Sequence, residues 1–288
     1  MFLQCGKHRL DLSRPVVMGI LNVTPDSFSD GGRFVNPAAA IAHGLAMVEA
    51  GAGIIDIGGE STRPGAQAVS EEQEIRRVVP LVEALASTVD VPLSVDTSKA
   101  GVIRAAIKAG ATFINDVRAL REAGALEAAA DSDAGLCLMH MQGEPRTMQM
   151  EPVYDDVVSE VREFLQSRLD ACAAAGIARD RLVVDPGIGF GKRIEHNMKL
   201  LAALPELLKL GRPLLIGVSR KSMFGTLLGR AVGERLAGAL AVAVSSVLAG
   251  AGIVRTHDVA ETVDALKVAA ALRMSGYWTA EVNPGERL

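Results

Sequence analysis

Several features are scarce in this chain of 288 residues, and each absence excludes a class of protein. Aromatic residues make up only 3% of it, and Lys and Arg form no block anywhere along the chain. The formal net charge is −4. Because a phosphate backbone needs a basic footprint, we expect no nucleic-acid partner.

Cysteines and long apolar segments are also scarce. The three cysteines, Cys5, Cys137 and Cys172, are far apart and form no CxxC motif, which indicates reduced thiols in a cytoplasmic protein. The N-terminal residues lack the apolar core of a signal peptide. The longest apolar stretch, residues 236–253, is rich in Ala and Gly, so we expect a buried helix that leads into a strand and no membrane span.

Short β-branched runs alternate with Ala- and Leu-rich stretches along the whole chain. The runs are expected to be strands buried on both faces: residues 16–21, 53–57, 92–96, 112–116, 135–139, 182–185, 213–218 and 251–255. The helices expected between them include residues 37–50, 71–87, 100–109, 153–175, 197–209, 233–248 and 259–274. Eight strand–helix units in about 250 residues favour an α/β fold, a closed (β/α)8 TIM barrel. An open doubly wound sheet is the alternative.

No linker or low-complexity tract interrupts this alternation. We therefore predict one domain, residues 1–288, with the barrel core at about residues 15–275.

Polar residues break the apolar pattern where the strands end. They are Asn22, Glu60, Ser61, Thr62, Arg63, Asp96, Asn115, Asp116, His140, Asp185, Ser219, Arg220, Lys221, Arg255 and His257. In a barrel all these positions open onto the C-terminal face, where active sites lie. Helix caps and turns explain many single Asp or Asn residues equally well, and Asp96 fits either role. Caps do not account for three basic side chains at the ends of the last two strands, so the pattern predicts a ligand site.

The residue types at this predicted mouth suggest what the ligand is. Arg63, Arg255 and His257 would form a cationic group suited to a pyrophosphate, and Asn22 offers a hard oxygen ligand for Mg²⁺. Loops 22–32 and 58–65 are longer than a plain βα turn needs and are candidate lids.

The acceptors at other strand ends point to a ring-shaped ligand. Asp96, Asn115 and Asp185 suit a flat heterocycle that carries several N–H donors. Phe28, Met139 and Phe190 are candidate surfaces for its ring. The glycine-rich segment 185–191 matches neither nucleotide-binding glycine pattern.

Eight segments together resemble one enzyme family, the dihydropteroate synthases of folate synthesis. In chain order they are NVTPDSFSDGG, IDIGGESTRPGA, SVDTSK, INDV, MHMQGEPRTMQ, DPGIGFGK, SRKSMFG and RTHDV. The resemblance runs from about residue 16 to 274. It implies a transferase that condenses 7,8-dihydropterin-6-ylmethyl pyrophosphate with p-aminobenzoate, with Mg²⁺ as cofactor, sulfonamides as competitive inhibitors and a homodimer. The apolar helices 240–248 and 259–274 are candidates for the dimer surface, although packing on the barrel also requires apolar helix faces.

The resemblance also implies roles for individual residues. Those of the pterin site would be Asp96, Asn115, Met139, Asp185, Phe190, Lys221 and Arg255. Asn22 would bind Mg²⁺, and the pyrophosphate would be held by Asn22, Thr62, Arg63, Arg255 and His257. The p-aminobenzoate pocket would contain Phe28, Thr62, Pro64, Phe190, Lys221 and Ser222. The residues acting in the reaction itself would be Asp30, Asp185, Lys221 and Arg255.

For the mechanism we expect dissociative loss of pyrophosphate. The electron-rich ring expels it and leaves a delocalised cation, which the neutral arylamine captures without a strong base. Two other functions remain open: a pterin-binding methyltransferase that holds methyltetrahydrofolate for a corrinoid, and a paralogue that binds pterin without turnover. The first would need neither Arg63 nor the pair Arg255 and His257, and the second predicts damage to loops 22–32 and 58–65, which are intact.

Overall fold

The computed structural model describes residues 1–23, 37–61, 68–144 and 147–275. Five of the predicted site residues, Phe28, Asp30, Thr62, Arg63 and Pro64, lie outside the described residues.

Eight parallel strands form the central sheet, in the order β8-β7-β6-β5-β4-β3-β10-β9. They are β3 (Val16–Asn22), β4 (Ile54–Gly58), β5 (Leu93–Asp96), β6 (Phe113–Asp116), β7 (Gly135–Met139), β8 (Leu182–Asp185), β9 (Leu215–Gly217) and β10 (Ile253–Thr256). The first and last strands of this order meet through a parallel bridge between Val184 and Leu214, and the Val184 amide donates to the Pro213 carbonyl at 3.0 Å. The ring of strands is therefore closed, so the predicted barrel is confirmed and the open sheet was wrong.

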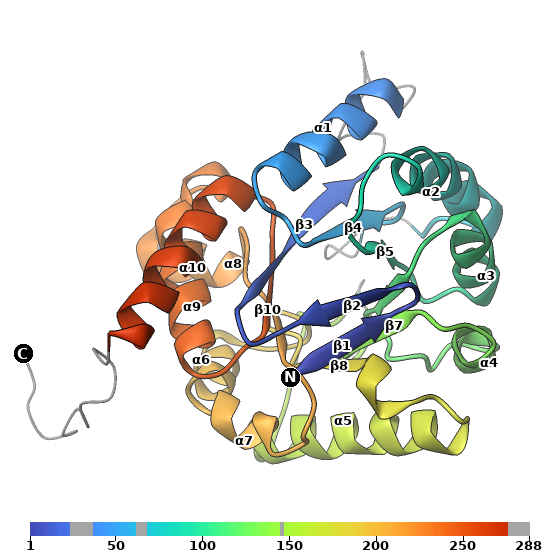
Figure 1. Cartoon of the computed structure of the whole chain (residues 1–288). Coiled ribbons are helices and arrows are strands. Elements are labelled where there is room, and N and C mark those ends of the chain that lie inside the picture. The colour runs from blue at the N-terminus through green and yellow to red at the C-terminus, as the bar shows by residue number, and fades with distance from the viewer. Residues whose placement is uncertain (24–36, 62–67, 145–146, 276–288) are drawn as a thin grey trace, which may run out of the picture.

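Helices surround this ring, as Figure 1 shows. They are α1 (Pro37–Glu49), α2 (Glu71–Ala86), α3 (Ala100–Ala109), α4 (Ala125–Ala130), α5 (Val157–Ala174), α6 (Ile194–Ala202), α7 (Leu204–Leu208), α8 (Ser222–Leu228), α9 (Leu236–Leu248) and α10 (Val259–Met274). Two 3₁₀ turns, η1 (Arg179–Arg181) and η2 (Val232–Glu234), precede β8 and α9. Among the residues described, no helix is long and apolar enough to cross a membrane.

Three helix predictions were wrong in their boundaries. The helix expected at 197–209 is two helices, α6 and α7, because Pro205 lacks the amide hydrogen that a continuous helix would need there. The helix expected from residue 153 begins only at Val157, where the Asp156 side chain accepts from the Val158 amide and caps it. The one expected at 233–248 begins at Leu236, after η2. The short helices α4 and α8 were not predicted.

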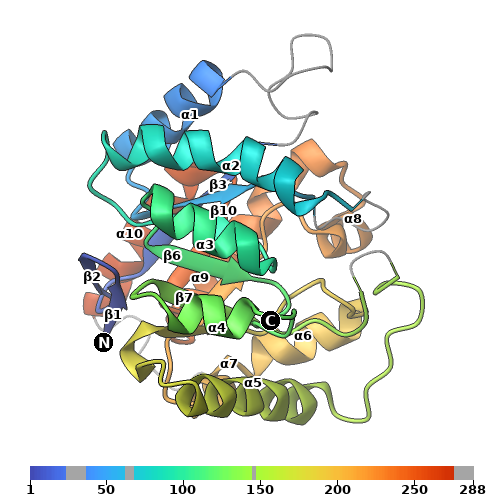
Figure 2. The same cartoon turned by 90° about the vertical axis from the view of Figure 1, so that its right-hand side faces the viewer.

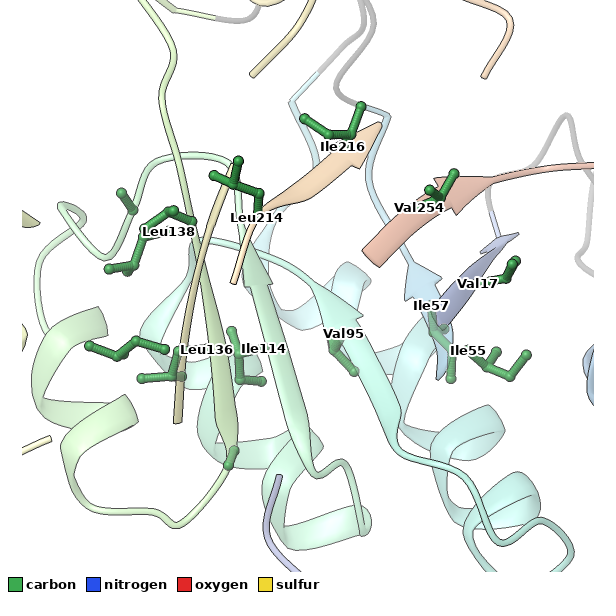
Figure 3. Close-up of a cluster of buried hydrophobic side chains, with 14 of the residues drawn as sticks. Val17, Ile55, Ile57, Val95, Ile114, Leu136, Leu138, Leu214, Ile216 and Val254 are labelled. Carbon is green, nitrogen blue, oxygen red and sulfur yellow. The ribbon is translucent and has the colours of Figure 1, made fainter. Parts of the chain in front are cut away.

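Alternate residues of the strands point to opposite sides of the barrel wall. The outward side chains pack against the helices in one apolar cluster, part of which Figure 3 shows: Val17, Ile55, Ile57, Val95, Ile114, Leu136, Leu138, Leu214, Ile216 and Val254. A second cluster, here called the lower core, lies at the N-terminal ends of the strands: Met18, Ile54, Phe113, Cys137, Val183, Leu215 and Ile253. Two residues further along four of these strands stand Asp56, Asn115, Asp185 and Arg255. The interior thus changes from apolar to polar along the barrel axis.

A β-hairpin that the sequence did not predict covers the lower core. Strands β1 (Phe2–Cys5) and β2 (His8–Asp11) pair in antiparallel register, and Leu3 and Cys5 belong to the lower core. In Figure 2 the hairpin lies at the left of the barrel and α8 at the right, at the opposite end. The hairpin seals the N-terminal end, so the polar interior opens only toward the C-terminal ends of the strands.

Candidate active site

Asp56 is the centre of the polar interior. Its carboxylate is fully buried and accepts three hydrogen bonds: from Ser94 Oγ at 2.5 Å, from Asn115 Nδ2 at 3.0 Å and from Arg255 Nε at 2.6 Å. These bonds compensate the cost of burying a charge. They also fix the amide of Asn115, whose nitrogen faces Asp56 and whose Oδ1 is left as an acceptor. Sequence reasoning missed Asp56, although it is the one charged residue in its apolar run.

Arg255 connects Asp56 to Asp96. Its second terminal nitrogen lies 2.8 Å from Asp96 Oδ2, so one guanidinium holds two carboxylates. Burial acts to lower the pKa of Arg255, but the two carboxylates outweigh it and raise the pKa, so the side chain stays charged. Asp96 does not cap the next helix, because the N-cap of α3 is Lys99. Of the two roles that the sequence allowed, the structure places Asp96 in the polar interior.

Asp185 and Lys221 are two further charged groups of the same interior, and each influences the pKa of the other. Burial raises the pKa of Asp185 to about 6, while the Gly187 amide, 2.7 Å from Oδ1, and the charge of Lys221 oppose the rise. Burial lowers the pKa of Lys221 to about 8, against the attraction of Asp185. Burial likewise raises the pKa of Asp96 to about 7, against the charge of Arg255. At neutral pH, Asp185 and Lys221 are therefore both charged. A small fall in pH would protonate Asp185, and a small rise would deprotonate Lys221.

The turn before Lys221 has an unusual backbone. Arg220 has a φ of 58°, in the left-handed region, and its guanidinium pairs with Asp258 at 2.7 Å. Arg235 donates to the carbonyls of both Arg220 and Lys221. These contacts hold a strained turn that carries Lys221 back over the barrel, where Nζ lies 3.9 Å from the centroid of the Phe190 ring.

A polar group at the mouth is formed by Asn22, Ser219 and His257. Asn22 Nδ2 lies 3.4 Å from His257 Nε2, and Ser219 Oγ lies 2.9 Å from His257 Nδ1. With its nitrogen toward His257, Asn22 presents Oδ1 as a hard ligand for a cation. No group of three or more His, Cys, Asp or Glu residues in the described ranges is arranged to hold a metal. A metal at Asn22 would therefore need most of its ligands from a bound molecule.

The two predicted ring-packing residues within the described chain lie together. Met139 is buried with Val117, Met141 and Met148, and Phe190 packs against this group. Met139 is the register partner of Asp185, and Phe190 contacts Lys221. The structure thus places an apolar surface beside these two charged groups, where a flat ring has one polar edge and one apolar face to contact.

Four polar residues named at strand ends or in the pockets have other surroundings. Asp116 is buried and accepts from the amides of Arg118 and Leu120, so it forms a turn. His140 is buried against Lys192, Tyr154 and Phe164, outside the polar interior. Glu60 pairs with Lys99 at 2.6 Å, and Ser222 is an exposed first residue of α8.

Comparison with known proteins agrees with this geometry. Residues 18–257 match the family model described as pterin binding enzyme. The dihydropteroate synthase of Escherichia coli K12 is 56% identical over 262 residues, which cover 91% of this chain and 93% of that protein. The crystal structure of the Yersinia pestis dihydropteroate synthase with a sulfonamide drug is 55% identical with a TM-score of 0.91, over 95% of this chain and 100% of that one.

A third relative holds the reaction product. The Xanthomonas albilineans dihydropteroate synthase in complex with 7,8-dihydropteroate is 49% identical with a TM-score of 0.86, and the match covers 95% of this chain and 99% of that one. Both the family match and the identities extend over most of the chain and include the strands that carry the polar interior. This chain belongs to the pterin-binding enzyme family, among the dihydropteroate synthases of folate synthesis.

Proposed function

We propose that this chain joins 7,8-dihydropterin-6-ylmethyl pyrophosphate to p-aminobenzoate, releasing pyrophosphate and forming 7,8-dihydropteroate. One observation carries the proposal: buried acceptors on β5, β6 and β8 stand with the half-buried ammonium of Lys221 in one polar interior, beside an apolar surface. The relatives named above, with sulfonamide and dihydropteroate bound, support the same substrates. The methyltransferase alternative has no support from these relatives.

The acceptors suit the amino-pyrimidine edge of a dihydropterin. That edge carries N–H donors, which Asp96, Asp185 and Asn115 Oδ1 are placed to accept. Lys221 supplies the opposite polarity and donates to ring acceptors. Met139 contributes to the apolar surface beside the ring, and the guanidinium of Arg255, fixed by its two carboxylates, provides a flat charged surface.

The pyrophosphate would lie toward the mouth. Arg255 and His257 bring positive or donor groups there, and we propose Thr62 and Arg63 for the same role. Asn22 fits Mg²⁺ only as one oxygen ligand of an ion that arrives with the pyrophosphate, because the described residues build no carboxylate cage. When bound, Mg²⁺ would neutralise charge that develops on the leaving group.

We propose that the carbon–oxygen bond to pyrophosphate breaks first, with its electron pair leaving on the pyrophosphate. Ionised Asp185 stabilises the positive charge that spreads into the pterin ring. The amine of p-aminobenzoate then forms the new carbon–nitrogen bond and loses a proton. Asp30 would lie near the cation.

The second substrate would occupy a neighbouring pocket. For p-aminobenzoate, and for sulfonamides in competition with it, we propose Phe28, Thr62, Pro64, Phe190, Lys221 and Ser222. Within the described residues, the contact between Lys221 and Phe190 supports this pocket.

The experiment that tests the function is release of pyrophosphate from the pterin substrate, in the presence of Mg²⁺, as p-aminobenzoate is added. We expect turnover by the wild type and its loss in Asp185→Ala and Lys221→Ala, because each change leaves hydrogen-bonding groups of the bound pterin without a partner. Near-normal kcat/KM in either variant refutes the assignment. Binding without release by the wild type means a pterin-binding paralogue.

We also propose a homodimer and a cytoplasmic location. Helices α9 and α10 pack on each other and leave Val268 and Leu272 exposed on α10, which fits an interface between copies. Monomers only, measured by light scattering at micromolar concentration, would contradict this. The three cysteines are free and buried, as in proteins of a reducing compartment.

A further inference from the structure

Lys192 is a buried lysine to which the proposed mechanism gives no role. Its side chain is 3% exposed, and three acceptors lie 2.9 Å from Nζ: the carbonyl oxygens of Gly187 and Phe190, and Nδ1 of His140. Three acceptors around one nitrogen use all three hydrogens of an ammonium, which is the form of Lys192 below its pKa, and burial lowers that pKa to about 7. Burial lowers the pKa of His140 to about 2, so its ring is neutral and accepts through Nδ1.

The two carbonyls belong to one tight turn, residues 187–190. The Phe190 amide donates to the Gly187 carbonyl at 3.0 Å and closes the turn, so Lys192 binds the carbonyls of its first and last residues. The turn is also held by the Asn197 side chain, which accepts from the Gly189 amide at 2.7 Å. Every one of these contacts fixes backbone, and none involves a group placed to touch substrate.

The same two ends of the turn hold site residues. The Gly187 amide donates to Asp185 Oδ1 at 2.7 Å, and the Phe190 ring lies 3.9 Å from Lys221 Nζ. Asp185 faces the proposed pterin and Phe190 the proposed p-aminobenzoate. A displacement of the turn would therefore change the relative position of groups that contact the two substrates.

We propose that Lys192 is a positioning residue, whose ammonium fastens the turn 187–190 and so sets the spacing between Asp185 and Phe190. The assignment rests on the proposed function, because it concerns how the two substrates of that reaction are brought together. It goes further by naming a residue without substrate contact as a determinant of p-aminobenzoate affinity.

The first test is Lys192→Met, which keeps the apolar stem and removes the ammonium. We expect KM for p-aminobenzoate to rise on the order of tenfold, because the loss displaces Phe190. The change in kcat should be less than about threefold, because Asp185 is held by β8 and Lys221 by the turn before α8. Lys199→Met on α6, an exposed lysine, is the matched control and should change neither. An unchanged KM in Lys192→Met overturns the proposal.

A pH measurement provides a second readout. The charged groups that act on Asp185 are Lys221, Lys192 and Arg255, and each lowers its pKa against burial. Removing the charge of Lys192 should therefore move the acid limb of pterin binding to higher pH. Lys192→Arg keeps the charge, so in that variant the limb should stay where it is in the wild type.

Lys192→Arg keeps the proposal testable if Lys192→Met does not fold. A terminal guanidinium nitrogen carries two hydrogens and cannot serve three acceptors around one point. We expect a melting temperature near that of the wild type with KM for p-aminobenzoate raised as in Lys192→Met. A wild-type KM in Lys192→Arg overturns the proposal, even if Lys192→Met fails to fold.

A double-mutant cycle separates positioning from general destabilisation. Phe190→Leu alone should raise KM for p-aminobenzoate, and adding Lys192→Arg to it should raise KM by less than about threefold more, because both changes act on one contact. Effects that multiply would mean that Lys192 acts independently of Phe190, which contradicts the proposal.

The affinity for the pterin pyrophosphate is measured by calorimetry, separately from turnover. A wild type that binds but does not react would fail the proposed function only, and the acid-limb comparison would still decide the role of Lys192.

Discussion

Replacing Asp185 by Asn should make the protein more stable while it weakens the proposed pterin site. Burial raises the native pKa of Asp185 from 3.8 to about 6, and the side chain is only 4% exposed. At pH 7 the carboxylate is ionised, and a shift of about two units at 1.36 kcal/mol each means that this charge costs about 3 kcal/mol of stability. Asparagine keeps the size and the Oδ1 acceptor for the Gly187 amide without the charge. Its NH₂ group fits poorly beside the ammonium of Lys221, so we expect a gain of about 1–3 kcal/mol.

The assay is thermal unfolding of both proteins between pH 4 and 7.5. A gain of this size raises Tm by about 2–6 °C in a chain of this length. A carboxyl whose native pKa is raised adds stability that is complete below pH 3.8 and is lost as the pH rises through about 6. The difference in Tm should therefore be small near pH 4 and full at pH 7, with pterin binding at least about tenfold weaker in the variant. A variant less stable than the wild type at pH 7, or a difference independent of pH, would refute the reasoning.

Three further predictions concern pH, a glycine and the metal. Binding of a dihydropterin without pyrophosphate should be strongest between about pH 7, above which Asp96 and Asp185 are both ionised, and about pH 8, where Lys221 loses its proton; equal affinity from pH 5 to 9 would contradict this. Gly187→Ala places a Cβ 1.8 Å from the His140 carbonyl oxygen and should lower the free energy of unfolding, measured in urea, by at least about 3 kcal/mol. The control is Gly176→Ala, also at positive φ but with nothing within 4 Å, which should lower it by about 1 kcal/mol. Similar losses in the two variants would disprove the role of the close contact. Chelation of Mg²⁺ should weaken binding of the pterin pyrophosphate more in the wild type than in Asn22→Ala, which lacks one oxygen ligand of the ion. An equal response in the two proteins would exclude Asn22 as a ligand.

The strands could be predicted because a buried parallel strand is apolar on both faces. All eight β-branched runs are strands of the barrel. The same continuity conceals the inward positions, so the sequence does not separate the lower core from the polar interior. Helix boundaries failed where a local feature decides them, such as Pro205 between α6 and α7. The hairpin of β1 and β2 was not predicted, because two strands of four residues each carry almost no periodic pattern of apolar residues.

The site could be predicted in part from the same pattern. The position of Asp96, Asn115 and Asp185 at strand ends indicated an acceptor group, but their substrates and individual roles came from the family resemblance. Asp56 and Lys192 were missed because their importance depends on partners far away in the chain, such as Arg255 and His140. No local pattern states which distant group a buried charge will meet.

The hairpin of β1 and β2 bears on the order in which the two proposed substrates bind. With one end of the barrel sealed, every molecule enters and leaves through the mouth. The acceptors proposed for the pterin lie inside the barrel, whereas Ser222 of the proposed p-aminobenzoate pocket is exposed. A p-aminobenzoate that arrived first would stand in the path of the pterin, so the deeper ligand has to enter before it, and the joined product must withdraw with its pterin end last.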